Sequence, residues 1–230
     1  MNPISDLSKK VISVPYIDQT RLWPTGCESV STVMLLQYLS IDISVEEFVR
    51  YLPKYSLREE GNVLIGADPN EYFIGSPDDP ESYGCYAPVI CKTLSHIFTE
   101  KRLPFQAENV SGLSTDSLLE NYIDKDIPVI YWATIDMKAS FQGTPWLLYS
   151  PEGRPFTWRA NEHCMLLTGY DADHLHFNDP WHNHGAIAYD RQLVLDRHAE
   201  MFSMAVAVTV CMHPHTRYIC VITTHSTHMS

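Results

Sequence analysis

The sequence lacks several features that mark whole classes of protein. Its 230 residues contain no run of about 18 apolar residues, so no membrane-spanning helix is expected. The six cysteines include no Cys-x-x-Cys pair, which argues against a zinc ribbon, and they are too few for a disulfide scaffold. Residues 1–10 contain no apolar signal-peptide core, so we expect a cytoplasmic protein, or a secreted one if the chain is a processed fragment.

Positive charge is also scarce. The chain has 16 Lys and Arg residues against 28 Asp and Glu residues, which gives a formal net charge of −12. Phosphate binding requires a basic surface, so neither nucleic acid nor an anionic membrane surface is an expected partner. Cationic peptides, neutral polymers and small molecules remain possible partners. The composition, 45% hydrophobic and 19% charged, is that of an ordinary globular protein.

A cysteine lies where a buried helix is expected to begin, in the stretch TGCESVSTVMLL at residues 25–36. Thr25 and Glu28 have the spacing of a capping box, which predicts Thr25 as the N-cap and Cys27 as the second helical residue. Free N–H groups and the positive end of the helix dipole are expected to lower the pKa of a thiol there. A buried structural cysteine is the alternative interpretation.

The remaining pattern predicts helices first and strands afterwards. Apolar spacing and capping signals predict further helices at 45–52, 84–101, 114–123 and 190–201. β-Branched and aromatic content predicts an edge strand at 105–110 and buried or half-buried strands at 127–133, 163–170, 174–179, 185–189 and 205–211. Long loops are expected at 56–83 and 136–161. This order predicts an α+β fold, and we expect one domain over 1–230, with a helical part at about 20–125 and a sheet part at about 126–212.

Four short motifs occur in an order that is typical of one enzyme family. Gln19 precedes Gly26-Cys27, the stretch EHCMLLTGYD follows at residues 162–171, and NDPW follows at residues 178–181. In this order the motifs resemble the C39-like group of papain-fold cysteine peptidases, over roughly residues 11–210. The resemblance implies a papain-like fold and a bacterial enzyme that hydrolyses a peptide or protein substrate through a thioester, without a cofactor.

The resemblance also implies a role for each motif. Cys27 would be the nucleophile, and His163 would act as its base and later as an acid. The Gln19 amide and the Cys27 backbone N–H would stabilise the oxyanion. Gly26 would let the substrate approach closely, and Trp181 would shield the site from water.

Two adjacent residues compete to orient the imidazole of His163. If the strands at 163–170 and 174–179 pair through a three-residue turn, Asp179 lies on the same sheet face as His163. A two- or four-residue turn would place Asn178 there instead, so strand parity alone leaves both open. The resemblance favours Asp179, the acid of the Asp-Pro step.

Three other interpretations stay open. An acyltransferase or deamidase would use the same thioester, and a catalytically inactive papain-like binding module would keep the fold without the chemistry. The third is a metal-binding protein built on the His-x-His pairs at 174/176, 182/184 and 213/215. No Cys, Asp or Glu set at a recognised zinc spacing accompanies these pairs, so we expect no metal site.

Overall fold

An antiparallel sheet forms the centre of the computed structural model, which describes residues 9–150 and 152–211. Its strands follow the order β12-β11-β10-β7-β13-β6, and β1 pairs with β10 beside this path. Every pairing in this sheet is antiparallel. The strands are β1 (Lys10–Val11), β6 (Phe105–Asn109), β7 (Val129–Thr134), β10 (Glu162–Tyr170), β11 (His174–Asp179), β12 (Gly185–Asp190) and β13 (Ala205–Val210).

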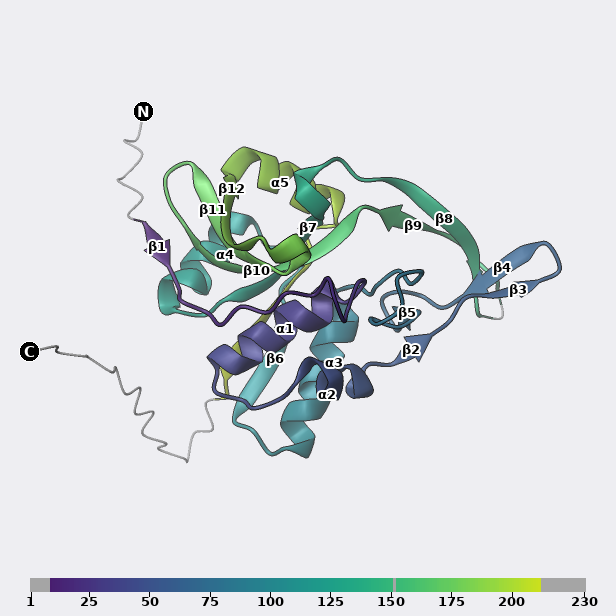
Figure 1. Ribbon diagram of the computed structural model, residues 1–230, viewed down its shortest axis with the longest axis horizontal. Coiled ribbons are helices and arrows are strands. Elements are labelled where there is room, and N and C mark those ends of the chain that lie inside the picture. The colour runs from purple at the N-terminus through teal and green to yellow at the C-terminus, as the bar shows by residue number, and fades with distance from the viewer. Residues whose placement is uncertain (1–8, 151, 212–230) are drawn as a thin grey trace, which may run out of the picture.

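Helices cover both faces of this sheet (Figure 1). One face carries α1 (Cys27–Tyr38), α2 (Val45–Tyr51) and α3 (Ala87–Glu100), and the other carries α4 (Thr115–Asn121) and α5 (Arg191–Glu200). The capping signals of the sequence are confirmed at α2 and α4, where Ser44 and Ser114 accept from a backbone N–H in the first turn. Asp190 caps α5 in the same way. The α+β fold is therefore confirmed, including β6 as an edge strand.

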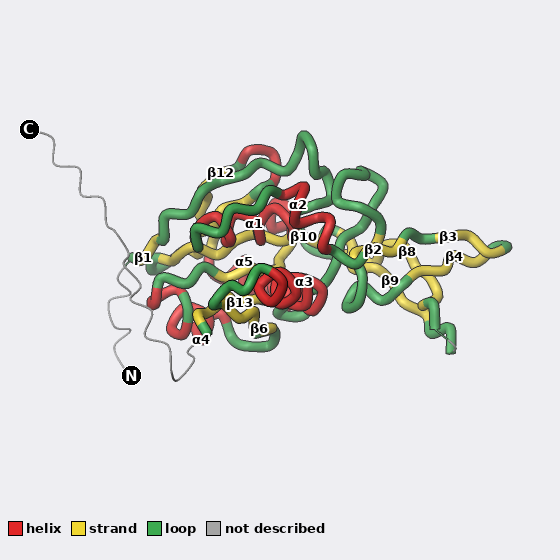
Figure 2. Tube along the Cα trace, turned by 90° about the horizontal axis from the view of Figure 1, so that it is seen from below, coloured by secondary structure: helices red, strands yellow, loops and turns green. Residues whose placement is uncertain are grey.

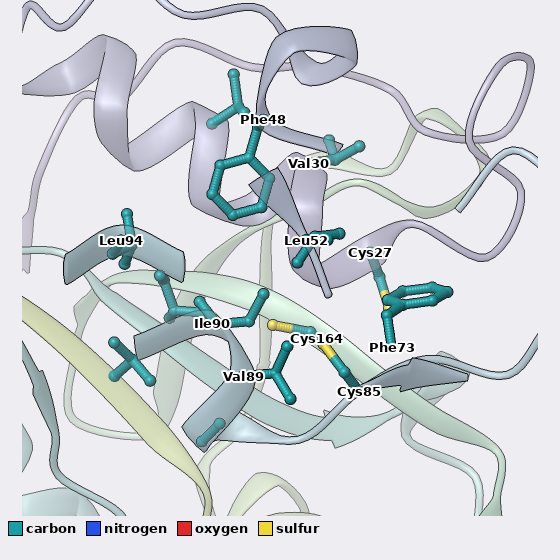
Figure 3. Close-up of a cluster of buried hydrophobic side chains, with 14 of the residues drawn as sticks. Cys27, Val30, Phe48, Leu52, Phe73, Cys85, Val89, Ile90, Leu94 and Cys164 are labelled. Carbon is teal, nitrogen blue, oxygen red and sulfur yellow. The ribbon is translucent and has the colours of Figure 1, made fainter. Parts of the chain in front are cut away.

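Alternating side chains of β10 build two separate cores. Cys164 and Leu166 point to the face of α1, α2 and α3, whereas Met165 and Leu167 point to the face of α4 and α5. Figure 3 shows the first core, in which Cys27, Cys85 and Cys164 lie among apolar side chains. Because the strand is buried on both faces, it reads as a continuous apolar run in the sequence.

Of the two segments expected to be long loops, residues 56–83 are mostly irregular with three short strands, whereas residues 136–161 are mainly a hairpin. Residues 136–161 contain a hairpin of β8 (Phe141–Leu148) and β9 (Pro155–Ala160), and residues 56–83 contain β3 (Arg58–Glu60), β4 (Val63–Gly66) and β5 (Phe73–Ile74). The strand order β3-β4-β8-β9 makes a second sheet, which projects from the body (Figure 2). Short β2 (Lys54–Tyr55) pairs with β5.

The loop expectation failed because Gly and Pro are tolerated at irregular positions of a strand. Gly143 and Pro145 lie at a register shift between Gln142 and Pro145, where the ladder is already interrupted. Aromatic packing then holds the hairpin against the body, since Trp146 and Trp158 are buried and both contact the ring of Tyr83.

No helix within residues 9–150 and 152–211 is both long enough and apolar enough to cross a membrane.

Candidate active site

Helix α1 begins one residue later than the capping box predicted. Gly26 is the N-cap and Cys27 is the first helical residue, with no side chain capping the helix. The Thr25 hydroxyl instead donates to the backbone carbonyls of Ser76, at 3.2 Å, and Asp79, at 3.0 Å. The expectation that Thr25 caps the helix is therefore wrong, because its hydroxyl ties the start of α1 to the 76–79 loop.

Gly26 serves the packing of this helix start. A side-chain carbon at position 26 would lie 2.9 Å from Trp23 Cβ and 3.1 Å from Pro77 Cβ, both closer than ordinary van der Waals contact. Gly26 is also absent from the residues that line the cavity described below. The structure thus uses its missing side chain for contact between two loops, and the approach of substrate to Gly26 stays a prediction.

Gly26→Ala is expected to lower the free energy of unfolding by about 1–3 kcal/mol, because Trp23 and Pro77 must move to admit the methyl group. Denaturant unfolding of wild type and Gly26→Ala measures this difference, provided that the unfolding free energy of both proteins falls with denaturant concentration at the same slope. An unchanged unfolding midpoint would show that both neighbours yield without cost.

A cavity of about 450 Å³ lies at the amino end of α1. Four of the predicted site residues line it: Gln19, Cys27, His163 and Trp181. They come from the segment before α1, from α1 itself, from β10 and from the turn after β11. The fold therefore brings together in one cavity residues that are up to 162 positions apart between Gln19 and Trp181 (181 − 19).

The imidazole of His163 is bound to Asp179. His163 Nε2 lies 2.7 Å from Asp179 Oδ1, and both side chains are about 1% exposed. An Nε2–H that donates to this carboxylate leaves the other ring nitrogen, Nδ1, as a proton acceptor. This is the tautomer that a base for a neighbouring thiol requires.

A β-bulge places Asp179 on the same face as His163. Near the turn, Tyr170 pairs with Leu175, which corresponds to a four-residue turn and by itself would favour Asn178. The register then shifts between Leu167 and Gly169, so that Leu166 pairs with Asn178. Asp179 consequently comes opposite Met165, two residues after His163 and on its face.

Asn178 points to the opposite face and holds the amino-terminal segment. Its Nδ2 donates to the backbone carbonyls of Val14, at 3.1 Å, and Pro15, at 3.2 Å. Of the two competing residues, the structure therefore brings Asp179 to the imidazole and takes Asn178 away from it.

Two further side chains bind Asp179. The Tyr189 hydroxyl donates to Oδ2 at 2.7 Å, and His184 Nδ1 lies 3.1 Å from the same oxygen. Sequence reasoning missed both residues. The only sequence signal for either residue is the His-x-His pair at 182/184, which fits the metal-binding alternative equally well. Their positions on the β11–β12 connection and on β12 become meaningful only once β12 pairs with β11.

These contacts keep Asp179 ionised. Burial alone would raise the pKa of the Asp179 carboxyl, but the hydrogen bond and charge of His163, with the donors Tyr189 and the Trp181 N–H, hold that pKa well below its ordinary value. An ionised Asp179 can therefore accept from Nε2 and stabilise a charged imidazole.

Gln19 and Trp181 flank the same two groups. Gln19 is buried, and its Nε2 donates to the Pro24 carbonyl at 3.2 Å. Its second amide hydrogen has no acceptor among the described residues and can serve another acceptor. The Trp181 backbone N–H donates to Asp179 Oδ1 at 3.0 Å, and its ring lies edge-on to His163 with 6.4 Å between ring centroids. Trp181 thus packs against the His163–Asp179 pair, and its role in shielding the site from water stays a prediction.

A model of the Peptidase C39-like family matches residues 11–205. This chain belongs to the Peptidase C39-like family. The match includes every predicted site residue and spans the cavity.

Two solved structures are similar to this C39-like protein. A candidate C39-like peptidase from Bacillus anthracis has a crystal structure that superposes with a TM-score of 0.74 at 25% identity, covering 87% of this chain and 97% of that chain. A double-glycine motif protease from an AMS/PCAT transporter, solved with its leader peptide, gives a TM-score of 0.48 at 13% identity over 89% of this chain and 96% of that chain.

Among curated proteins, the uncharacterised protein YvpB of Bacillus subtilis is 25% identical over 182 residues. The match covers 74% of this chain and 64% of YvpB, so the C39-like chain spans less than two thirds of that relative's length.

The nucleophile candidate of this C39-like protein faces an acidic side chain. Cys27 Sγ donates to Glu28 Oε2 at 3.3 Å. Burial raises the pKa of the Cys27 thiol well above its ordinary value, and the carboxyls of Glu28 and Glu162 raise it further. The expectation of a lowered thiol pKa is therefore wrong for this arrangement, because burial and two acidic neighbours outweigh the helix dipole.

The His-x-His pairs of the C39-like chain are engaged in other contacts. His174 Nδ1 and His176 Nε2 lie 3.1 Å and 2.8 Å from the carboxylate of Asp171, and His184 belongs to the Asp179 network. The pair at 213/215 lies outside the described residues.

One other cluster of side chains is a candidate for binding a metal ion. Within residues 9–150 and 152–211, Cys27, Glu28 and Glu162 form the one set of three potential ligands whose donor atoms lie within 4.8 Å of one another. Both oxygens of Glu28 already accept hydrogen bonds, from Cys27 and from the Cys85 N–H, so we assign no metal to this set.

Proposed function

We propose that this C39-like protein is a cysteine peptidase that hydrolyses peptide bonds with Cys27, His163, Asp179 and Gln19. One observation carries the proposal: Cys27, Gln19 and a His163 imidazole whose Nε2 is held by a buried Asp179 line a single cavity. Membership in the C39-like family, together with the Bacillus anthracis structure, supports the same reaction class.

Each group has a defined task in this reaction. Nδ1 of His163 takes the proton of the Cys27 thiol, and the thiolate sulfur attacks the carbonyl carbon of the scissile bond. The oxyanion that forms accepts hydrogen bonds from the free Gln19 amide hydrogen and from the Cys27 backbone N–H at the start of α1. Asp179 holds the imidazole and stabilises its positive charge.

The second half of the reaction reverses these proton transfers. When the carbon–nitrogen bond breaks, the leaving amine takes the proton from His163, and a thioester to Cys27 remains. His163 then accepts a proton from water, whose oxygen attacks the thioester carbonyl. The acid product leaves, and the Cys27 sulfur regains its proton.

The cavity is suited to an extended peptide with one bulky side chain. Its wall on the side of the β8–β9 hairpin contains Tyr83, Phe141 and Trp158. Aromatic walls of this kind bury apolar side chains and fix their orientation. We therefore propose a peptide or protein segment as the substrate.

Product analysis tests this function. The protein is incubated with a peptide mixture diversified at every position, with and without hydroxylamine, and new termini are identified by mass spectrometry. We expect free carboxylate products in water and hydroxamates in hydroxylamine, because hydroxylamine intercepts a thioester. Amine-dependent products without any free acid would show an acyltransferase, and ammonia release from intact peptides would show a deamidase. Absence of any of these products would favour the binding module.

A further inference from the structure

A pair of buried acids lies directly beside the candidate nucleophile. Glu28, on α1, and Glu162, on β10, are 0% and 7% exposed, and each has an oxygen within 4.8 Å of Cys27 Sγ. Glu28 uses both oxygens, because Oε2 accepts from Cys27 Sγ and Oε1 accepts from the Cys85 N–H at 2.6 Å. Glu162 Oε1 is buried and has no hydrogen-bond partner among the described residues.

The chain segment before α3 holds the Glu28 carboxyl in this position. A side-chain carbon at Gly84 would lie 2.5 Å from Glu28 Oε1, and the backbone there has a φ of +153°. Glycine therefore allows the backbone to press against the carboxyl and to direct the next N–H, that of Cys85, at it. The position of Glu28 is imposed by this contact and by the hydrogen bond to Cys85.

Among the residues that the structure describes, no cationic side chain is paired with either acid. The groups that face the pair are Cys27 on α1, Cys85 before α3, Cys164 on β10, Trp132 on β7 and the phenol of Tyr86. Within the described part of the chain, no ion pair reaches Glu28 or Glu162. Burial raises the pKa of Glu28 to about 7, and burial and Glu28 together raise that of Glu162 well above its ordinary value.

The thiol of Cys27 cannot serve Glu28 and His163 at the same time. A thiol has one hydrogen, and in this structure it is donated to Glu28 Oε2. The proposed reaction requires that hydrogen to pass to His163 Nδ1. The hydrogen bond of Cys27 in this structure is therefore not the one that the proposed reaction requires.

We propose that Glu28 is a positioning residue that holds the Cys27 thiol protonated at rest, so that Cys27 must exchange its hydrogen bond to Glu28 for one to His163 before it reacts. This inference rests on the proposed function, because the reactive state is defined there as the one in which Cys27 gives its proton to His163. It assigns to the acid beside the nucleophile a restraining role, distinct from the acid Asp179 that assists His163.

The rate of Cys27 alkylation as a function of pH tests this proposal. The protein is treated with iodoacetamide in EDTA-containing buffer from pH 5 to pH 10, and labelling is quantified on the tryptic peptide Leu22–Arg50, in which Cys27 is the only cysteine. In Glu28→Gln we expect the midpoint of the pH profile to fall by about one unit, and labelling at pH 7 to be about tenfold faster, because the thiolate is the reactive form. Glu120→Gln, an exposed acid on α4, is the matched control and is expected to leave the profile unchanged.

Several results would overturn the proposal. An unchanged or higher midpoint in folded Glu28→Gln would mean that Glu28 does not restrain the thiol. If that variant does not fold, the wild-type profile decides, since a wild-type midpoint below the ordinary thiol value of about 8.5 is incompatible with a restrained thiol.

Failure of the proposed function gives a different pattern. If the protein cleaves no peptide but Glu28→Gln still lowers the alkylation midpoint, the restraint stands and the peptidase proposal falls. If Cys27-dependent cleavage occurs and the midpoint does not move, the peptidase proposal stands and the restraint falls.

Discussion

Cys27→Ala is expected to reduce peptide hydrolysis by about 10⁴-fold or more, because it removes the atom that forms the covalent intermediate. His163→Ala is expected to have an effect of similar size, since the thiol then has no base and the leaving amine no acid. The two residues act as one unit, so the double variant should be no slower than the slower single variant. Single-turnover kinetics on a substrate identified from the peptide mixture measures all three rates.

A second cysteine provides the matched control for this experiment. Cys91 is half-buried on α3 and does not line the cavity, so Cys91→Ala should hydrolyse the substrate at the wild-type rate. Thermal unfolding of each variant establishes that the fold is intact. Turnover by Cys27→Ala at more than a few per cent of the wild-type rate would refute the cysteine mechanism.

Asp179→Asn is expected to reduce kcat by about 10²–10⁴-fold while leaving the shape of the site intact. An asparagine amide can donate to Nε2 of His163, so the ring proton moves to Nδ1. A protonated Nδ1 can no longer accept the proton of Cys27. Steady-state kinetics of wild type and Asp179→Asn on the same peptide substrate measures the loss.

The neighbouring residue distinguishes catalysis from stability in this test. Asn178→Ala removes the hydrogen bonds to Val14 and Pro15 from the opposite face of β11, so it should lower stability without changing the tautomer of His163. A kcat loss in Asn178→Ala that equals the loss in Asp179→Asn, at a temperature where both are folded, would contradict the assignment of Asp179.

Removing the Asp179 carboxylate should also destabilise the fold. Asp179→Ala leaves His163 and Tyr189 without their buried acceptor, and a loss of about 3–5 kcal/mol is expected at neutral pH. Because the folded-state pKa of Asp179 lies below its unfolded value of 3.8, this stabilisation is fully present above that pH and is lost as pH falls further. Denaturant unfolding of wild type and variant should therefore converge below about pH 4. If the difference in unfolding free energy between the two proteins stays constant down to pH 2, the charge of the Asp179 carboxylate is not the source of the stabilisation.

Strand patterns in the sequence do not decide whether Asp179 or Asn178 orients His163. Strand alternation determines which residues share a face only when the register is known, and one extra residue reverses the result. The chain forms the four-residue turn that favours Asn178 and then a bulge after Leu167 that restores Asp179. A bulge has no reliable signal in a single sequence, since it depends on what each strand packs against.

The pKa of the Cys27 thiol likewise could not be predicted from the local sequence. The helix start was predicted to within one residue, and the dipole argument for a lowered thiol pKa follows from that local structure. Glu162 is 135 positions away in the chain (162 − 27), and its approach to Cys27 is a consequence of how α1 lies on β10. Burial with two acids then reverses the sign of the local effect.

The sequence by itself determined the order of the helices and of the main strands of the central sheet, the apolar faces that bury them, and the four motifs that indicate the C39-like family. These properties are local or periodic, so they can be read along the chain. The sequence did not predict the second sheet of β3, β4, β8 and β9. The tertiary structure alone decided that Asp179 holds His163, that Tyr189 and His184 hold Asp179, and that Glu28 and Glu162 surround the thiol of Cys27. Those contacts depend on strand register and on the burial of charge between elements distant in sequence, and neither is specified before the sheet and α1 have packed together.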